Sequence, residues 1–420
     1  MHHEWRAGMA RTTFPIEPGT PLGGYIAREH PATGTLDPLQ IDVLLLDDGA
    51  HQMLIIGADV IAVDGDLVHQ IASRAGIAED RVLLGASHTH AGPRGIVERL
   101  HPSAAREADT ALRERFVHTT VELVTEARKA LEPVTLGVAT GDATGAWTNR
   151  NDPTGRADLR VRVLTVRDGA DQLLGAVVLF SCHPTVLSAD NLLVSADLAG
   201  GIRRAIADRI GTEPVLLTLT GAAGDTSTRS TRRGATPEEI DRLGGIAGEA
   251  ALAAMARTTP VSPGIRSAVE HVTLPPVDLK DRDLAAEVTL AHMRLRELET
   301  RGAPAEEIRT ATTQAQGALL RSRLADLPSV EIAIPAWRLG EELALAGIPG
   351  ELFASLGAGI EAAVRGEAWI VGYANGYAGY IPDRAAYAAG TYEALASPFG
   401  EDVGDVVVEG AIRALRQITP

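Results

Sequence analysis

The sequence predicts an α/β protein of the mixed α+β kind, with mixed β-sheets flanked by helices. Three observations support this class. Apolar, β-rich runs flank Asp-Gly turns and predict antiparallel hairpins, helical patterns alternate with these runs in the first half of the chain, and a long helical stretch interrupts the second half. Hairpins combined with helical crossovers argue against a purely parallel barrel.

In chain order, the first half predicts two hairpins joined by helices and single strands. The hairpins turn at Asp47-Asp48-Gly49 and at Asp168-Gly169, each between two apolar runs. The expected strands cover residues 41–46, 53–60, 82–86, 134–140, 159–166, 174–181 and 215–220. The expected helices cover residues 67–75, 105–131 and 197–210.

Residues 282–326 differ from the rest because they predict a helical hairpin inserted in the chain. A Gly302-Ala303-Pro304 break separates two helical patterns, and the first has its apolar residues at four-three spacing. These residues are Leu284, Val288, Ala291, Leu295 and Leu298. The hairpin is interpreted as an insertion that packs on the core by one apolar stripe, with a lid or a dimer arm as the alternative.

The remainder of the chain returns to β-structure. The expected strands cover residues 330–339, 343–347 and 368–372, and a helix is expected over 352–364. A terminal helix follows, for which Asp405 is the expected N-cap. Because no Ser- or Gly-rich linker divides the sequence, we expect residues 1–420 to form a single catalytic domain.

The composition is that of an acidic globular protein. The 420 residues include 39 Lys and Arg against 55 Asp and Glu, so the formal net charge is 39 − 55 = −16. This balance disfavours binding to nucleic acid or to anionic membranes. No apolar stretch approaches the length of a membrane span, so we expect no stable membrane insertion.

The cysteine count and the N-terminal residues bear on the compartment. The single cysteine, Cys182, excludes an intramolecular disulfide framework and a zinc cluster built on cysteines, and it agrees with a reducing compartment. The N-terminal residues contain no apolar run typical of a secretory signal, so we expect a cytoplasmic protein. The sequence leaves a homo-oligomer open.

The strongest local signal for chemistry is Ser87-His88-Thr89-His90-Ala91-Gly92-Pro93, where the expected strand 82–86 ends. In an extended segment, residues i and i+2 point the same way, so both imidazoles are expected to face one site. Ligands of open α/β sheets bind beyond such strand ends. The pair therefore predicts a candidate metal site.

Two further strand ends carry polar motifs. The apolar run 176–181 leads into Cys182 and His183, and the run 215–220 leads into a Gly-rich turn with Asp225 and Ser227. Neighbouring strand residues face opposite sides, so Cys182 is interpreted as a small buried residue and not as a co-ligand of His183. The Gly-rich turn lacks the Gly-x-Ser-x-Gly pattern of a serine-hydrolase elbow.

Seven short motifs occur in the order in which the neutral (alkaline, non-lysosomal) ceramidases have them, so the chain resembles this family over nearly all of its length. They are Ser-His-Thr-His-Ala-Gly-Pro at 87–93, Asn149-Arg150, Cys-His-Pro at 182–184, Ser195-Ala-Asp197, Gly-Asp-Thr-Ser at 224–227, Pro349-Gly350-Glu351 and Asn375-Gly-Tyr-Ala-Gly-Tyr380. Each motif is short, but seven motifs in the same order along the chain are a specific signal. The resemblance implies the fold of a neutral-ceramidase-like catalytic domain.

The resemblance also implies the cofactor and its ligands. Members of this family hydrolyse the amide of N-acylsphingosines with one zinc ion, which implies Zn²⁺ here. The implied metal ligands are His88, His183, Glu351 and Tyr380, with Tyr377 as a rival of Tyr380.

The same resemblance also implies four active-site residues: His90, Arg150, Ser227 and Tyr392. His90 matches a histidine that faces the substrate, and Arg150 matches an active-site arginine. Ser227 matches the serine of the family's Gly-Asp-x-Ser, and Tyr392 lies twelve residues after Tyr380, where the family has a second active-site tyrosine.

The chain also departs from the family pattern. The family's Gly-Asp-x-Ser-Pro-Asn stands here as Gly-Asp-Thr-Ser-Thr-Arg at 224–229, and an early Gly-x-His-x-Arg-Leu appears only as Gly-Thr-Leu-Asp-Pro-Leu at 34–39. Full-length ceramidases also carry a C-terminal immunoglobulin-like domain and usually a secretory signal, and we expect neither here. These departures argue that the substrate differs from ceramide.

The sequence therefore predicts a zinc-dependent hydrolase that cleaves a linear N-acyl amide by zinc-activated water, with a small-molecule or lipid-like substrate. The alternatives are a zinc hydrolase of a small non-sphingolipid amide, ester or lactam, and a metal-binding module without activity. A third alternative is a protein that works by binding a partner through the 282–326 hairpin.

Overall fold

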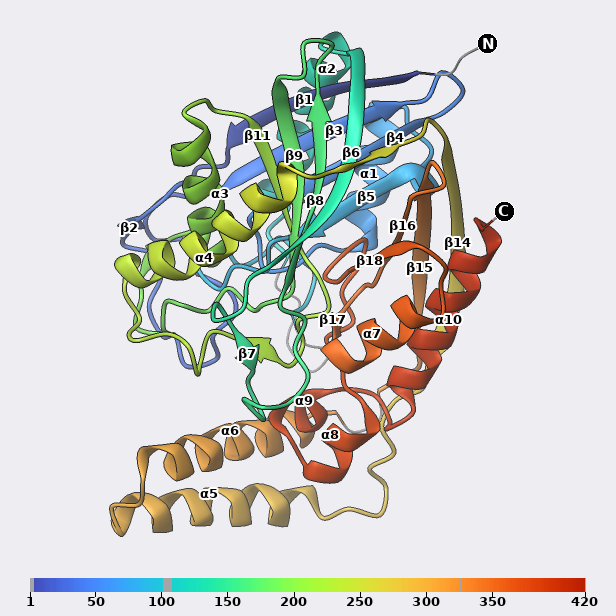
Figure 1. Cartoon of the computed structure of the whole chain (residues 1–420). Coiled ribbons are helices and arrows are strands. Elements are labelled where there is room, and N and C mark those ends of the chain that lie inside the picture. The colour runs from blue at the N-terminus through green and yellow to red at the C-terminus, as the bar shows by residue number, and fades with distance from the viewer. Residues whose placement is uncertain (1–3, 101–107, 325–326, 420) are drawn as a thin grey trace.

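The computed structural model describes residues 4–100, 108–324 and 327–419. Its largest element is a nine-stranded mixed sheet in the order β11-β9-β8-β6-β1-β3-β4-β5, with β13 paired to β6 (Figure 1). Its strands are β1 Trp5–Thr13, β3 Gln40–Asp47, β4 Gln52–Ala58, β5 Val82–Ala86, β6 Glu132–Asp142, β8 Arg160–Arg167, β9 Leu173–Phe180, β11 Val215–Thr220 and β13 Thr259–Val261. Both predicted hairpins are present as the antiparallel pairs β3–β4 and β8–β9.

A second sheet has four strands in the order β14-β15-β16-β18. These are β14 Ile265–Leu274, β15 Val330–Leu339, β16 Leu343–Gly347 and β18 Glu367–Val371. Three short pairs complete the β-structure: β2 Gly34–Thr35 with β10 Leu193–Val194, β7 Thr148–Asn149 with β12 Thr226–Ser227, and β17 Glu351–Leu352 with β19 Tyr380–Ile381.

Helices flank both sheets. They are α1 Gly65–Ala75, α2 Thr110–Lys129, α3 Asp197–Ile210, α4 Pro237–Met255, α5 Leu284–Thr300, α6 Ala305–Arg321, α7 Ala354–Ala362, α8 Arg384–Ala389, α9 Tyr392–Ala396 and α10 Val403–Gln417, with a 3₁₀ turn at Glu79–Arg81. The mixed sheets covered by helices confirm the predicted fold class. Among the described helices, none combines the length and the apolar character that a membrane span requires.

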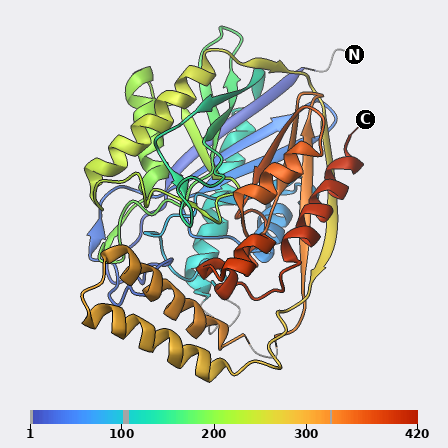
Figure 2. The same ribbon diagram turned by 60° about the horizontal axis from the view of Figure 1, so that its bottom comes forward.

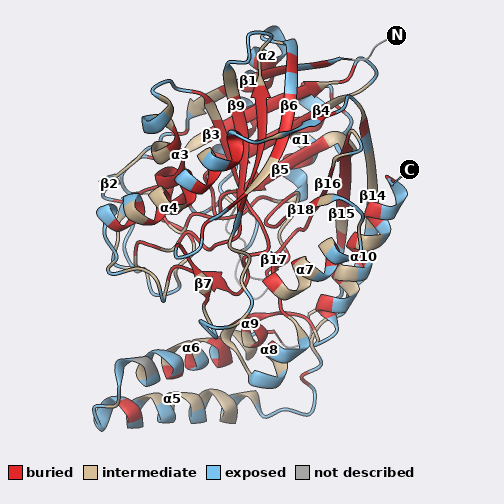
Figure 3. Ribbon diagram, in the orientation of Figure 1, coloured by how far each residue is buried: buried red, intermediate tan, exposed pale blue. Residues whose placement is uncertain are grey.

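The core lies between the two sheets. Alternate side chains of the large sheet, such as Leu44, Leu83 and Leu217, pack against Trp337 and Trp369 of the second sheet. The opposite face is covered by α1 and α2 at one end and by α3 and α4 at the other, and α10 covers the outside of the second sheet. The strands are accordingly buried along most of their length (Figure 3).

The large sheet curls on itself, so that the edge strand β11 contacts β3, β4 and β5. Two glycines make this approach possible. A Cβ at Gly57 would lie 3.1 Å from the Thr218 carbonyl oxygen, and one at Gly85 would lie 2.6 Å from Leu219 Cδ2. The ends of β5 and β11 are therefore close in space.

Two expected boundaries change. The terminal helix begins at Val403, after Asp402 at the N-cap position, and Asp405 lies in its first turn, so the N-cap prediction was wrong. The expected 105–131 helix is observed as α2, and its residues 105–107 lie outside the described part of the chain.

Residues 282–326 contain α5 and α6, which lie side by side below α8 and α9 (Figures 1 and 2). The inward residues of α6 are small, with Ala311, Ala315 and Ala318 buried, whereas Leu290 and Met293 of α5 are exposed. The assignment of residues 1–420 to a single domain stays a prediction.

Candidate metal centre

The predicted ligands and most of the predicted active-site residues lie at or just after a piece of β-structure at one end of the sheets, whereas Tyr392 begins helix α9. His88 follows β5, His183 follows β9, and Ser227 lies in β12 after β11. Glu351 opens β17 and Tyr380 opens β19, and these two residues are directly paired. The sheet framework therefore places all of these segments around one region.

His88 is fixed by its backbone conformation, by a contact at Nδ1 and by a stacked tyrosine ring. Its φ of 63° is in the left-handed region, which costs energy for a residue with a Cβ and persists only where the surroundings hold it. The Nδ1 atom lies 2.6 Å from the Ile61 carbonyl oxygen. The ring also stacks on Tyr373, with centroids 3.9 Å apart. His88 is thus held in one orientation with Nε2 free to face the centre.

His183 is also held in one orientation, by contacts with two backbone carbonyl oxygens. Its backbone N–H donates to the Thr226 carbonyl at 3.0 Å, and Nδ1 lies 2.7 Å from the Ala223 carbonyl oxygen. A carbonyl oxygen can only accept, so Nδ1 of both His88 and His183 must carry the proton. In the neutral rings, Nε2 then presents a lone pair.

The histidines and a carboxylate converge on one point. Nitrogens of His88, His90 and His183 lie within 4.8 Å of one another, and Nε2 of His88 and His90 are 3.3 Å apart. Glu351 Oε2 lies 2.9 Å from His183 Nε2 and 3.6 Å from His88 Nε2. Burial lowers the pKa of His88 to about 3 and holds the pKa of His183 well below its usual value.

This donor set fits a zinc ion. The two neutral imidazoles direct lone pairs at a buried carboxylate oxygen, an arrangement of acceptors that a cation between them would satisfy. The Nδ1–carbonyl contacts of His88 and His183 are the orienting partners that metal-bound histidines have in proteins. His88, His183 and Glu351 would hold the ion, and His90 lies close enough to be a fourth neighbour.

The carboxylate of Glu351 is oriented by two tyrosines. Tyr377 Oη donates to Oε1, and Tyr373 Oη lies 3.5 Å from Oε2. Tyr380 instead has its Oη 3.1 Å from Arg150 Nη2, and its ring is nearly parallel to that of His183, at 6.4 Å between centroids. Burial raises the pKa of both Tyr377 and Tyr380. The structure thus gives the two tyrosines different partners, and the choice of Tyr380 as a ligand stays a prediction.

Arg150 is locked by an ion pair that sequence reasoning missed. Its Nε donates to Glu393 at 2.6 Å and its Nη2 to the Gly224 carbonyl at 2.8 Å. Asn151 donates to the other oxygen of Glu393 at 3.0 Å. Burial opposes the charge of Glu393, but Arg150 and these hydrogen bonds hold its pKa below the usual value. The only available signal was its position directly after Tyr392.

His90, Arg150, Ser227 and Tyr392 line one cavity of about 750 Å³, together with Tyr380. Tyr392 meets the Tyr380 ring edge-on at 6.0 Å, and Ser227 pairs with His183 in a β-bridge. Nδ1 of His90 is buried and has no hydrogen-bond partner in the described part of the chain. These four residues are therefore together, although their roles stay predictions.

Helix α6 forms one wall of this cavity through Arg309, Thr310, Thr313, Gln314 and Gln316. The helix packs on α9, whose first two residues are Tyr392 and Glu393. The helix pair therefore reaches the site that the motifs surround. Its action as a lid stays a hypothesis.

Two buried aspartates explain why other motifs accompany the histidines. Asp197 accepts from the backbone N–H groups of Val186 and Leu187 at 3.1 and 3.0 Å, and so fixes the loop after His183. Asp225 accepts from Asn149 at 2.6 Å and from the Ala354 N–H at 2.9 Å. Burial raises the pKa of each to about 6, so both carboxylates take up a proton at a higher pH than an exposed aspartate does.

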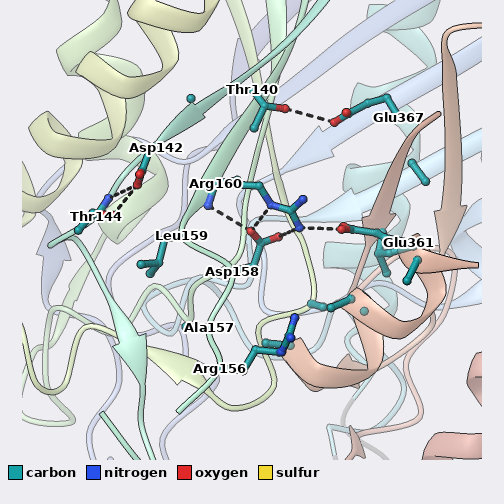
Figure 4. A pocket seen from close by; sticks show the side chains of 18 of the residues that line it. Thr140, Asp142, Thr144, Arg156, Ala157, Asp158, Leu159, Arg160, Glu361 and Glu367 are labelled. Atoms are coloured by element: carbon teal, nitrogen blue, oxygen red, sulfur yellow. Dashed lines mark hydrogen bonds and ion pairs between the residues drawn. The ribbon is translucent and has the colours of Figure 1, made fainter. Parts of the chain in front are cut away.

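A second cavity, of about 780 Å³, lies between β8 and α7 and contains none of the histidines (Figure 4). Several of its charged groups are paired with one another. Arg160 donates to Asp158 at 2.7 Å and to Glu361 at 2.6 Å, and Thr140 donates to Glu367. The candidate metal ligands and the implied active-site residues lie at the other cavity, so we place the functional site at the histidines.

Gly224→Ala is expected to lower zinc affinity about 10- to 100-fold, the cost of disturbing a partner of a metal ligand. A Cβ at Gly224 would lie 2.3 Å from the Glu351 carbonyl oxygen, so the two backbones must separate and Glu351 must move. The measurement is a titration against a competing chelator. Gly245→Ala is the matched control, because a Cβ there meets nothing within 4 Å; zinc affinity equal to wild type in both variants would contradict the prediction.

Comparison with known proteins supports the motif analysis. Residues 19–211 match the family model described as neutral/alkaline non-lysosomal ceramidase, N-terminal. A neutral ceramidase of Mycobacterium tuberculosis is 29% identical over an alignment of 175 residues, and the match covers 36% of this chain and 27% of that protein. The matched region thus spans about a quarter of this relative.

Two solved structures share the fold. One is described as ceramidase complexed with C2, and the other is neutral ceramidase from Pseudomonas aeruginosa. Each has a TM-score of 0.77 and 18% sequence identity, and the match covers 100% of this chain and 76% of the other. The motifs, the family model and the fold agree: residues 19–211 are similar to the N-terminal part of the neutral/alkaline non-lysosomal ceramidases, and the chain shares the fold of the two solved structures.

Proposed function

We propose that this protein is a zinc-dependent hydrolase that cleaves an N-acyl amide bond in the manner of a ceramidase. The observation that carries the proposal is the pair of histidine Nε2 lone pairs directed at Glu351, beside a cavity lined by Arg150, Tyr380 and Tyr392. A zinc ion held by His88, His183 and Glu351 would polarise a carbonyl and lower the pKa of water to about 7, and amide hydrolysis needs both effects.

The residues of the chain supply orientation and proton transfer. The hydrogen bonds of Arg150 within the described residues use Nε and Nη2, which leaves Nη1 to donate to the carbonyl oxygen of a bound amide. Tyr392 is the second donor that we assign to this oxygen. Burial keeps the pKa of His90 low and its ring neutral, so the ring can take a proton from the attacking water and pass it to the leaving amine.

The cavity favours a smaller or more polar substrate than a long-chain ceramide. Hydroxyl, amide and guanidinium groups of α6 and of residues 227–232 form much of its wall. Pockets for lipid-like molecules are mostly apolar. A small amide, ester or lactam is therefore the favoured substrate, whereas a metal-binding module without activity leaves Arg150, Tyr392 and Ser227 around the cavity unexplained.

Two measurements test the proposed function. Protein purified without chelator should contain one zinc ion per chain by elemental analysis, and it should hydrolyse N-acyl amides. Chelation should stop the hydrolysis and added zinc should restore it. Absence of zinc together with no uptake on reconstitution would end the proposal, and so would a zinc-loaded chain that cleaves none of the amides.

The substrate preference is tested with ceramides of several chain lengths against short N-acyl amines, esters and lactams. We expect a higher kcat/KM for a short, polar amide than for a long-chain ceramide, because the wall offers hydrogen bonds and few apolar contacts. A kcat/KM for long-chain ceramide of about 10⁴ M⁻¹s⁻¹ or more, as for an ordinary enzyme with its own substrate, would contradict this expectation.

A further inference from the structure

The cavity beside the metal centre concentrates positive charge in a protein of net charge −16. Besides Arg150, its wall contains Arg229, Arg232 and Arg309. Among its described lining residues, Glu393 is the only carboxylate, and it is already bound to Arg150. Three guanidinium groups therefore face the cavity without a counter-charge in its wall.

The individual contacts of these arginines also show that their charges are not neutralised by carboxylates. Within the described residues, the side chains of Arg229 and Arg309 have no ion-pair partner. Arg232 Nη1 donates to the carbonyl oxygens of Thr185 and Val186, which orient it but carry no charge. Burial, together with the neighbouring charges of Arg150, Arg309 and Arg232, lowers the pKa of Arg229. Arg229 therefore lies where its positive charge is disfavoured, and a bound anion would relieve this.

The second cavity offers a contrast. There, Arg160 is paired with Asp158 and Glu361 (Figure 4), and Arg162 of the same strand is paired with the same two carboxylates. Within the described residues, Arg229, Arg232 and Arg309 have no such carboxylate partner. Arg229 also stands where the family motif has asparagine, two residues after Ser227, and Arg309 lies on α6.

We propose that the substrate is an N-acyl amide that carries an anionic group, a carboxylate or a sulfonate, bound by Arg229 and Arg309 with support from Arg232. The proposal rests on the proposed hydrolase function, and it names the substrate class of that same site. Guanidinium groups suit this role because their planar N–H pairs match the oxygens of such anions.

The test uses three substrates with one acyl chain: N-hexanoylglycine, N-hexanoyltaurine and the neutral N-hexanoylglycinamide. For the zinc-loaded protein, we expect kcat/KM to be about 10- to 100-fold higher for the preferred anion than for the glycinamide, as one or two charge-assisted hydrogen bonds would give. The preferred anion distinguishes a carboxylate from a sulfonate. The ratio should fall in Arg229→Gln and in Arg309→Gln, and in the wild type it should fall as salt concentration rises.

Arg296→Gln is the matched control, because Arg296 is an exposed arginine of α5 that does not line the cavity. It should keep the wild-type ratio. The zinc content and circular dichroism of each variant separate a local effect from misfolding. Calorimetric binding of N-hexanoylglycine and N-hexanoyltaurine, each against the glycinamide, adds a readout that does not depend on turnover.

The outcomes separate this inference from the proposed function. Equal cleavage of anionic and neutral amides, with a ratio unchanged by Arg229→Gln, would overturn the anion site and leave the hydrolase standing. Arginine-dependent binding of one anion without cleavage of any amide would support the anion site and overturn the hydrolase. If the protein neither cleaves these amides nor prefers an anion in binding, both proposals fail.

Discussion

Glu351→Gln is expected to lower zinc affinity by at least about 100-fold, and amide hydrolysis with it, because the loss of a ligand should exceed the loss of an orienting partner. The carboxylate supplies the only negative charge among the three side chains that we assign to the ion, and a neutral amide oxygen replaces it poorly. Gln has the same size and can still accept from Tyr377, so the fold should survive.

The measurement is zinc affinity against a competing chelator, with circular dichroism as the check on folding. Glu331→Gln, on an exposed position of β15, is the control and should bind zinc like the wild type. His183→Ala should lose zinc as well, since it removes a lone pair from the same centre. If Glu351→Gln binds zinc like the wild type, Glu351 only supports the other ligands. The ligand role inferred for Glu351 from the family resemblance would then be wrong.

Glu393→Ala is expected to destabilise the protein by about 3–5 kcal/mol, the usual cost of leaving one member of a buried ion pair without its partner. The Arg150 and Glu393 side chains are only 9% and 2% exposed, so water cannot replace the lost carboxylate. The guanidinium also loses its anchor at Nε, so kcat should fall together with stability. Urea unfolding measures the first effect, and amide hydrolysis at fixed zinc content measures the second.

The double variant Arg150→Met/Glu393→Leu separates the two effects. Removing both charges should restore much of the stability, because no unpaired charge remains buried, but it should not restore hydrolysis. A loss below about 1 kcal/mol in Glu393→Ala would show that the pair contributes no more than a surface ion pair. The depressed pKa of Glu393 adds a pH test: its contribution is present above the unfolded-state pKa of about 4.3 and is lost as the pH falls through the lower folded-state pKa.

The sequence was sufficient to predict the fold class, both hairpins and the grouping of polar motifs at strand ends. One of its arguments was nevertheless incomplete. His88 and His90 converge, but not as residues of an extended segment, because His88 adopts a left-handed φ of 63°. The loop conformation depends on Tyr373 and on the Ile61 carbonyl, which are distant in sequence.

The meeting of His88 with His183 could not be derived from local patterns either. Strand pairing is antiparallel at each step from β4 through β3, β1, β6 and β8 to β9, so β5 and β9 would run in opposite senses in a flat sheet. A twist of about 20–25° per strand pair, accumulated over six pairs, turns their ends toward each other. The role of Glu393 could not be predicted, because the two residues of a buried ion pair have no characteristic spacing in a sequence.

The packing of α6 on α9 has a consequence for anyone who wishes to re-engineer this scaffold. A Cβ at Gly317 would lie 2.8 Å from Leu395 Cβ, so the two helices approach as closely as a glycine permits. Tyr392 and Glu393 begin the helix on which α6 rests. Grafting the α5–α6 segment of another protein would therefore alter selectivity and turnover together, and a transplant would need a glycine at the position of Gly317 to leave the tyrosine in place.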